Sequence, residues 1–62
     1  MNRRKFEQHL RAHGCILHHH GAKHDVWINA NTLARSPVPR HTRLKRGTCH
    51  GICRILSIPP CP

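Results

Sequence analysis

Four cysteines in a chain of 62 residues limit the kinds of fold open to it: Cys15, Cys49, Cys53 and Cys61. A short secreted chain with an even number of cysteines typically folds around disulfides, because its own core is too small. The N-terminal stretch MNRRKFEQHL is basic and has no apolar stretch after it, so it does not resemble a secretory signal. We therefore expect a cytoplasmic protein with reduced thiols that act as small hydrophobic side chains. A membrane-active cationic peptide with two disulfides is the alternative.

The charge of the chain is strongly unbalanced. Eleven Lys and Arg residues stand against Glu7 and Asp25 alone, which gives a formal net charge of +9. This excess predicts a negatively charged partner, which is a nucleic acid, an anionic membrane or an acidic protein. No segment approaches the roughly 18 apolar residues that a membrane span requires, so we expect no membrane-embedded part.

The first segment has the pattern of a helix from Asn2 to about His13. Asn2 is a suitable N-cap, and Phe6 and Leu10 lie four residues apart on one helical face. Gly14 suits the position after the helix, where a left-handed conformation is easily adopted by glycine. Glu7 lies at helical spacing between Arg4 and Arg11, so one carboxylate screens two cations. Positive charge in the first turn opposes the helix dipole, which indicates either a partner or a solvated basic face.

Three extended segments follow, at residues 15–20, 23–29 and 32–39. They are rich in β-branched and aromatic residues and are separated by turn residues. Pro37 and Pro39 predict that the third segment is an edge strand, since neither can donate a ladder hydrogen bond. Thr48 is then the expected N-cap of a second helix over residues 49–58, which Gly51 weakens by about 1 kcal/mol.

This order predicts an α+β fold of two layers, α-β-β-β-α, with a three-stranded antiparallel sheet and both helices on one face. It is the layout of double-stranded-RNA-binding-domain-like folds. A chain of this size buries only about 60% of its unfolded surface, so we expect a single domain over residues 1–58. Residues 59–62, PPCP, are expected to be a flexible proline-rich tail.

Four histidines surround the turn between the first two strands: His18, His19, His20 and His24. A zinc site would need a tetrahedral ligand set, but adjacent strand residues point to opposite faces and no C-x2-C pair is present. We therefore expect no metal and interpret the first three as polar residues of a half-exposed strand.

His24 differs in its surroundings, because it follows a glycine turn and has Lys23 beside it. An imidazole with a pKa of about 6.5 can accept or give a proton near neutral pH. RNA can be cleaved without a metal when such groups move protons and cations stabilise the phosphorane, a role open to Lys23, Arg40 and Arg43. A lone histidine is more often an ordinary strand-edge residue, and the apolar sequence VWI leaves the face of His24 undetermined.

Four stretches in this order resemble the HicA (YcfA-like) toxins, the small ribonucleases of type II toxin–antitoxin pairs, over residues 3–58: FEQHLRAHGC, GAKHDVW, VPRH and KRGTCHGICRIL. The most specific element is the G-x-x-H turn at Gly21–His24, followed by Val26 and Trp27. The resemblance implies a double-stranded-RNA-binding-domain-like fold and cleavage of mRNA without a metal or other cofactor. It implies that His24 is catalytic and that Gly21 shapes the turn. The family often has serine where this chain has Ala22 or Lys23, so neither position carries a hydroxyl that could orient the imidazole.

The same resemblance implies how the positive charge is used. The strand end PRH suggests that Arg40 and His41 contact phosphate, and basic residues of the first helix and the linker would grip single-stranded mRNA. The full set expected to bind RNA phosphate is Lys23, Arg40, His41, Arg43, Arg4 and Arg11. Trp27 could stack a base, but in so small a core we favour buried packing. A HicB-type antitoxin is implied as partner, acidic and covering His24 and the first helix. A non-catalytic RNA-binding module is the alternative function.

Overall fold

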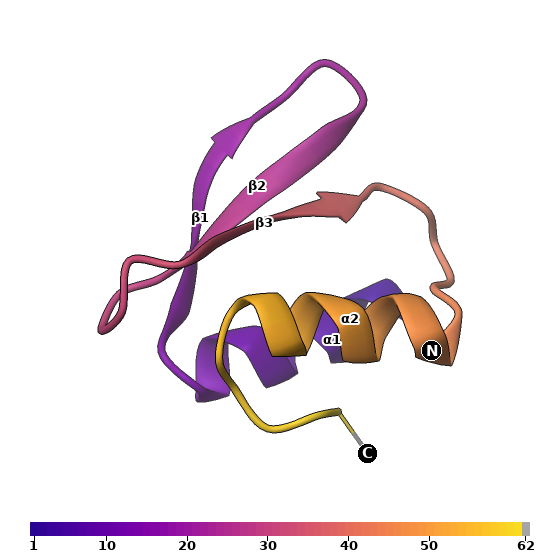
Figure 1. The fold of residues 1–62 in the computed structure, drawn as a ribbon. Coiled ribbons are helices and arrows are strands. Elements are labelled where there is room, and N and C mark those ends of the chain that lie inside the picture. The colour runs from indigo at the N-terminus through magenta and orange to yellow at the C-terminus, as the bar shows by residue number, and fades with distance from the viewer. Residues whose placement is uncertain (62) are drawn as a thin grey trace.

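The computed structural model describes residues 1–61, which form a sheet with two helices beneath it (Figure 1). The elements follow in the order α1 (Arg3–Ala12), β1 (Cys15–His20), β2 (His24–Asn29), β3 (Arg35–Pro39) and α2 (Arg46–Ile55). The three strands are antiparallel in the order β1-β2-β3, and both helices lie on the same side of the sheet. The predicted α+β two-layer fold is confirmed.

Helix α1 forms as its sequence predicts. The Asn2 side-chain oxygen accepts hydrogen bonds from the backbone N–H groups of Arg4 (2.8 Å) and Lys5 (3.4 Å). Phe6 and Leu10 are fully buried, and Gly14 adopts a positive φ of 83° after the helix. One detail of the prediction is wrong, because Glu7 is flanked by Arg3 (3.6 Å) and Arg11 (3.9 Å) and not by Arg4. Both pairs have i, i+4 spacing, which brings the long side chains together on one face.

The sheet places the first residue of β2 beside the last residue of β3. In their antiparallel register His24 lies opposite Pro39, and Trp27 lies opposite Ser36. The pairing of β1 with β2 is irregular between Leu17 and His19. β3 is an edge strand, as its prolines predict. It is the strand that lies over α2 (Figure 1).

Helix α2 begins earlier than expected. The N-cap is Lys45 and not Thr48, and its side chain makes no capping hydrogen bond. The preceding Leu44 is buried, and its N–H donates to the Met1 carbonyl (2.7 Å), while the N-terminal ammonium donates to the Leu44 carbonyl. These long-range bonds fix where the chain enters α2, so they replace the local capping signal that the sequence offers. Within residues 1–61 no helix is long and apolar enough to cross a bilayer.

The core lies between the sheet and the helices and contains all four cysteines as free, buried thiols. Burial raises the pKa of the Cys15 and Cys53 thiols, and burial together with the neighbouring Cys61 thiol raises the pKa of Cys49 to about 11. These thiols are protonated at neutral pH and act as small apolar side chains. Cys61 belongs to the segment expected to be a flexible tail, yet its side chain is only 5% exposed.

The raised thiol pKa values predict that stability falls in alkaline solution. A cysteine of the unfolded chain ionises near pH 8.5, whereas Cys49 stays protonated in the fold until about pH 11. The stabilisation is therefore complete below about pH 8.5 and is lost as the pH rises from there toward 11. Urea denaturation at pH 7.5 and pH 10 should show a lower free energy of unfolding at the higher pH. In Cys49→Ala this decrease with pH, the pH slope of stability, should be smaller. An unchanged slope in Cys49→Ala, or fewer than four free thiols after unfolding without reductant, would contradict this account of the core.

Candidate functional site

His24 begins β2 at the surface, and its side chain is exposed to solvent. His24 is one of the residues that line a groove of about 360 Å³ between the edge of β3 and helix α2. Pro37 and Pro39 form the strand side of this groove, and Thr48 and Ile55 lie on the helix side. None of residues 1–61 forms a hydrogen bond with the ring, so it is free to meet a ligand from solvent.

A tight turn before β2 sets the position of His24. The N–H of Gly21 donates to the His24 carbonyl at 2.9 Å, which closes the turn. A Cβ atom at position 21 would lie only 2.6 Å from that carbonyl oxygen, a separation that real Cβ atoms do not reach. Any larger residue at position 21 would therefore push the turn, and His24 with it, out of place.

Arg40 fastens this turn to the end of β3. Its Nε donates to Asp25 Oδ1 at 2.8 Å, one Nη donates to the Gly21 carbonyl, and the other lies 3.5 Å from the Ala22 carbonyl. His20 Nδ1 lies 2.8 Å from the same carboxylate oxygen. The hydrogen bond from Arg40 lowers the pKa of Asp25, against a smaller opposing effect of burial. The guanidinium is thus engaged within the fold and ties together the segments before and after Lys23–His24.

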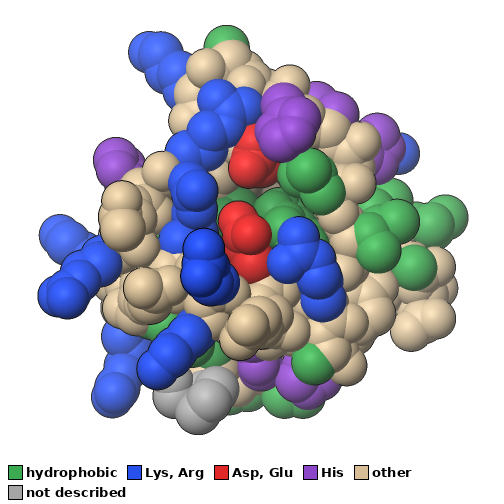
Figure 2. Space-filling view, turned by 180° about the vertical axis from the view of Figure 1, so that it is seen from behind, with side chains coloured by type: hydrophobic (Ala, Val, Ile, Leu, Met, Phe, Trp, Pro, Cys, Tyr) green, Lys and Arg blue, Asp and Glu red, His purple; other side chains and the backbone are tan. Residues whose placement is uncertain are grey.

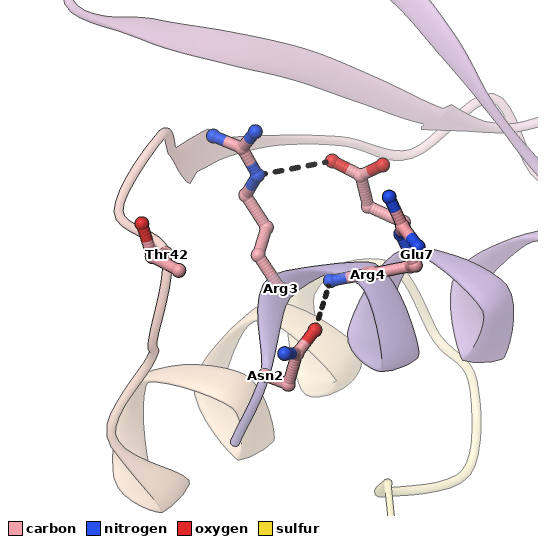
Figure 3. Close-up of a pocket in the computed structure, with 5 residues that line it drawn as sticks. All are labelled: Asn2, Arg3, Arg4, Glu7 and Thr42. Carbon is pink, nitrogen blue, oxygen red and sulfur yellow. Dashed lines mark hydrogen bonds and ion pairs between the residues drawn. The ribbon is translucent and has the colours of Figure 1, made fainter.

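Helix α1 extends this network. Arg3 donates from its guanidinium to the Arg40 carbonyl at 2.6 Å and pairs with Glu7. A hollow of about 400 Å³ lies beside it, lined by Asn2, Arg3, Arg4, Glu7 and Thr42 (Figure 3). On one face of the molecule Lys and Arg side chains border both acidic side chains, and a histidine lies beside one of them (Figure 2). Both acidic side chains of the protein are therefore neutralised by contacts within the fold, and the other Lys and Arg side chains make up its excess positive charge.

The other residues expected to bind RNA lie in three places. Lys23 is exposed in the turn next to His24. His41 and Arg43 are exposed in the connection between β3 and α2 and line a second hollow of about 420 Å³. Arg4 and Arg11 lie on α1, Arg4 in the hollow of Figure 3 and Arg11 with its guanidinium 5.1 Å from the Trp27 ring centre.

The histidines before the turn are not arranged as a metal site. His18 and His19 are exposed and lie with their Nδ1 atoms 2.9 Å apart. Across the part of the chain that the structure describes, no group of three or more His, Cys, Asp or Glu side chains could hold a metal ion. His20 is an exposed polar residue at the end of β1, as the sequence suggests, and it also contacts Asp25.

Sequence reasoning missed two features of the site. The first is the role of Asp25, for which the only signal is that one of two carboxylates directly follows His24. The second is the groove. In the sequence, Gly51 indicates only a weakened helix and Thr48 only a helix cap, and neither indicates a groove. Trp27 is 1% exposed, so it cannot stack a base, and the favoured interpretation as core packing agrees with this.

A comparison with known families matches residues 3–58 to one described as the HicA toxin of bacterial toxin–antitoxin systems. The match covers almost the whole chain, including the turn, His24 and both helices. Searches of curated proteins and of solved structures each returned no significant match.

Proposed function

Because the chain belongs to the HicA toxin family of bacterial toxin–antitoxin systems, we propose that it is a toxin endoribonuclease that cleaves mRNA without a metal, with His24 as the proton-transfer group. The observation that supports this most is the position of His24. His24 is exposed and is one of the residues that line the groove, while the turn that carries it is held by Gly21 and Arg40. A group that must meet RNA from solvent in a fixed place needs this combination.

The reaction that fits these residues is an internal transesterification. The 2′-oxygen of a ribose loses its proton and bonds to the adjacent phosphorus, the bond from phosphorus to the 5′-oxygen breaks, and that oxygen gains a proton. The products are a 2′,3′-cyclic phosphate and a 5′-hydroxyl. His24 serves as the base that takes the first proton or as the acid that gives the second. Lys23, beside it, stabilises the negative charge that develops on the phosphorane.

The remaining cations are proposed to hold the RNA strand by its phosphates. His41 and Arg43 line the hollow that adjoins the groove, and Arg4 lines the hollow beside α1. Arg11 also lies on α1, where its guanidinium is 3.9 Å from Glu7, so it adds to this set mainly through its charge. Arg40 attracts RNA phosphates through its positive charge but does not bond them, because its donors are engaged by Asp25 and the Gly21 carbonyl. Binding by charge predicts that RNA affinity falls steeply as salt rises.

The partner proposed to neutralise the toxin is a HicB-type antitoxin, acidic where this chain is basic. Several large apolar side chains remain exposed and would be covered by such a partner: Ile16, Leu17, Leu33 and Ile55. Ile55 lies in the same groove as His24, so an antitoxin that covers it would also block the proposed catalytic group. A cytoplasmic location follows from mRNA as substrate.

Two observations favour a second candidate, a non-catalytic RNA-binding module. The His24 ring has no hydrogen-bond partner within residues 1–61, and Ala22 and Lys23 stand where the family often has serine. Incubating the purified protein with mRNA in EDTA separates the two functions. The toxin should cut the RNA into fragments, whereas the module would retard it in a gel without cutting it.

A further inference from the structure

The groove beside His24 is mainly apolar and open to solvent. Its strand wall is formed by Pro37 and Pro39, and its helix wall by Gly47, Gly51 and Ile55. The volume of about 360 Å³ is within the range of small-ligand sites. Ile55 is 54% exposed although it lines this concave surface, so the groove is open to solvent along its helix wall.

The two glycines keep the groove open. Gly47 and Gly51 are four residues apart on α2, and a Cβ atom built at either position meets nothing within 4 Å. The space in front of them is therefore free, and a larger side chain at either position would extend into it. Neither glycine has the positive φ that would explain its presence by backbone conformation.

The strand wall is suited to a flat ring and unsuited to a peptide strand. Proline has no N–H, so β3 offers no donor at positions 37 and 39 to a peptide that would extend the sheet. The hydroxyl of Ser36 already donates to the Pro37 carbonyl at 3.1 Å. The wall thus presents proline rings, on which an aromatic base can lie without hydrogen bonds.

A basic hollow continues the groove. It shares Pro39 and Thr48 with the groove and is otherwise lined by His41, Arg43, Leu44 and Lys45. No carboxylate lines either hollow, and the chain carries a net charge of +9. An apolar site for a ring beside a cationic site for a phosphate matches the two parts of one nucleotide.

We propose that the groove between β3 and α2 is a nucleobase subsite, which binds one unpaired base of single-stranded RNA and sets the ribose of that nucleotide against His24. The proposal rests on the proposed function and adds how the substrate is placed. The phosphate beside this nucleotide lies in the hollow of His41, Arg43 and Lys45. The groove offers few polar groups to a base, because the Ser36 hydroxyl is already bonded and Thr48 supplies the other hydroxyl of the lining. The base is therefore held mainly by stacking, and the subsite tolerates different bases.

Filling the groove tests the subsite. Gly51→Leu and Gly47→Leu each place a side chain in the open space, and His50→Leu is the control, since His50 is exposed on the same helix and lines a different hollow. The probes are a labelled single-stranded RNA of eight nucleotides with 2′-O-methyl riboses, which resists cleavage, and the same strand with abasic sites. Anisotropy measures their binding, cleavage of the unmodified strand is measured in parallel, and circular dichroism verifies the fold of each variant.

We expect both groove variants to bind the base-containing strand about tenfold more weakly and to cleave it correspondingly more slowly. Their binding of the abasic strand and all properties of His50→Leu should stay within about twofold of the original protein. Folded groove variants that bind and cleave RNA normally would overturn the subsite. Variants that lose only the ability to bind the antitoxin, with RNA binding and cleavage unchanged, would overturn it as well. If the unaltered protein binds in a base-dependent way but never cleaves, the subsite stands and the proposed nuclease function fails.

Discussion

Replacing His24 by alanine is expected to slow RNA cleavage by about 10²–10⁴-fold, the usual contribution of a general acid or base, and to abolish growth arrest on expression. The fold should be unaffected, because the ring is exposed and bonds to nothing within residues 1–61. Its removal should therefore change the free energy of unfolding by no more than about 0.5 kcal/mol. Cleavage of a defined RNA in EDTA and urea denaturation of the same preparation measure the two quantities.

His18→Ala is the matched control for this substitution. His18 is also an exposed histidine of the sheet, and its contact is with the neighbouring His19 ring. Its loss should leave cleavage within about twofold of the original rate. Undiminished cleavage by folded His24→Ala, or an equal loss in His18→Ala, would remove the catalytic assignment.

Replacing Arg40 by alanine is expected to have the second largest effect, through the position of the turn. The substitution removes the donors to Asp25 and to the Gly21 and Ala22 carbonyls. The ion pair of Arg40 and Asp25 is partly exposed, with side-chain exposures of 37% for Arg40 and 13% for Asp25. Its loss should therefore lower the free energy of unfolding by about 1–2 kcal/mol. Cleavage should fall by about tenfold to a hundredfold, because a displacement of His24 by about 1 Å is sufficient for such a loss.

Two variants distinguish positioning of the turn from direct contact with phosphate. Arg40→Lys keeps the charge but cannot form the fork of hydrogen bonds, so it should restore RNA binding and little of the cleavage rate. Asp25→Asn leaves Arg40 in place and should reduce cleavage in a way that is not additive with Arg40→Ala. If Asp25→Asn instead bound RNA more tightly and cleaved it faster, Arg40 would act on phosphate and not on the turn.

The same pair predicts a pH dependence at the acidic end. The pKa of Asp25 is lowered in the fold by its hydrogen bond from Arg40, so its stabilisation is present above the unfolded value, about 3.9, and is lost as the pH falls through the lowered value. Asp25→Asn should remove this loss, and acid denaturation of the two proteins compares it directly. Parallel acid denaturation curves would show that the pair does not stabilise the fold.

The fold could be predicted because its signals are local. The spacing of Phe6 and Leu10, the cap at Asn2 and the prolines of β3 each act within one element, and together they give the order of helices and strands. The start of α2 could not be predicted in this way, because Leu44 is held by hydrogen bonds to Met1, 43 residues away. A capping residue such as Thr48 is only a local preference, and tertiary packing overrides it.

The candidate site was predictable only in part. The turn at Gly21 follows from a short motif, but the exposure of His24, the face of the sheet on which it lies and the groove depend on how β3 meets α2. Arg40 and Asp25 are 15 residues apart in the sequence, and only the antiparallel register brings them together. The boundary between the domain and residues 59–62 stays a prediction, although Cys61 contributes to the core.

The termini of the RNA products test the proposed chemistry most directly. Cleavage of a defined single-stranded RNA in EDTA should leave a 2′,3′-cyclic phosphate on one fragment and a 5′-hydroxyl on the other, and His24→Ala should leave the strand intact. A strand with a 2′-O-methyl group at the cleaved position should resist the protein, because its oxygen has no proton to give up. Fragments that end in a 3′-hydroxyl and a 5′-phosphate, or cutting of the methylated strand, would show that His24 does not act through the ribose.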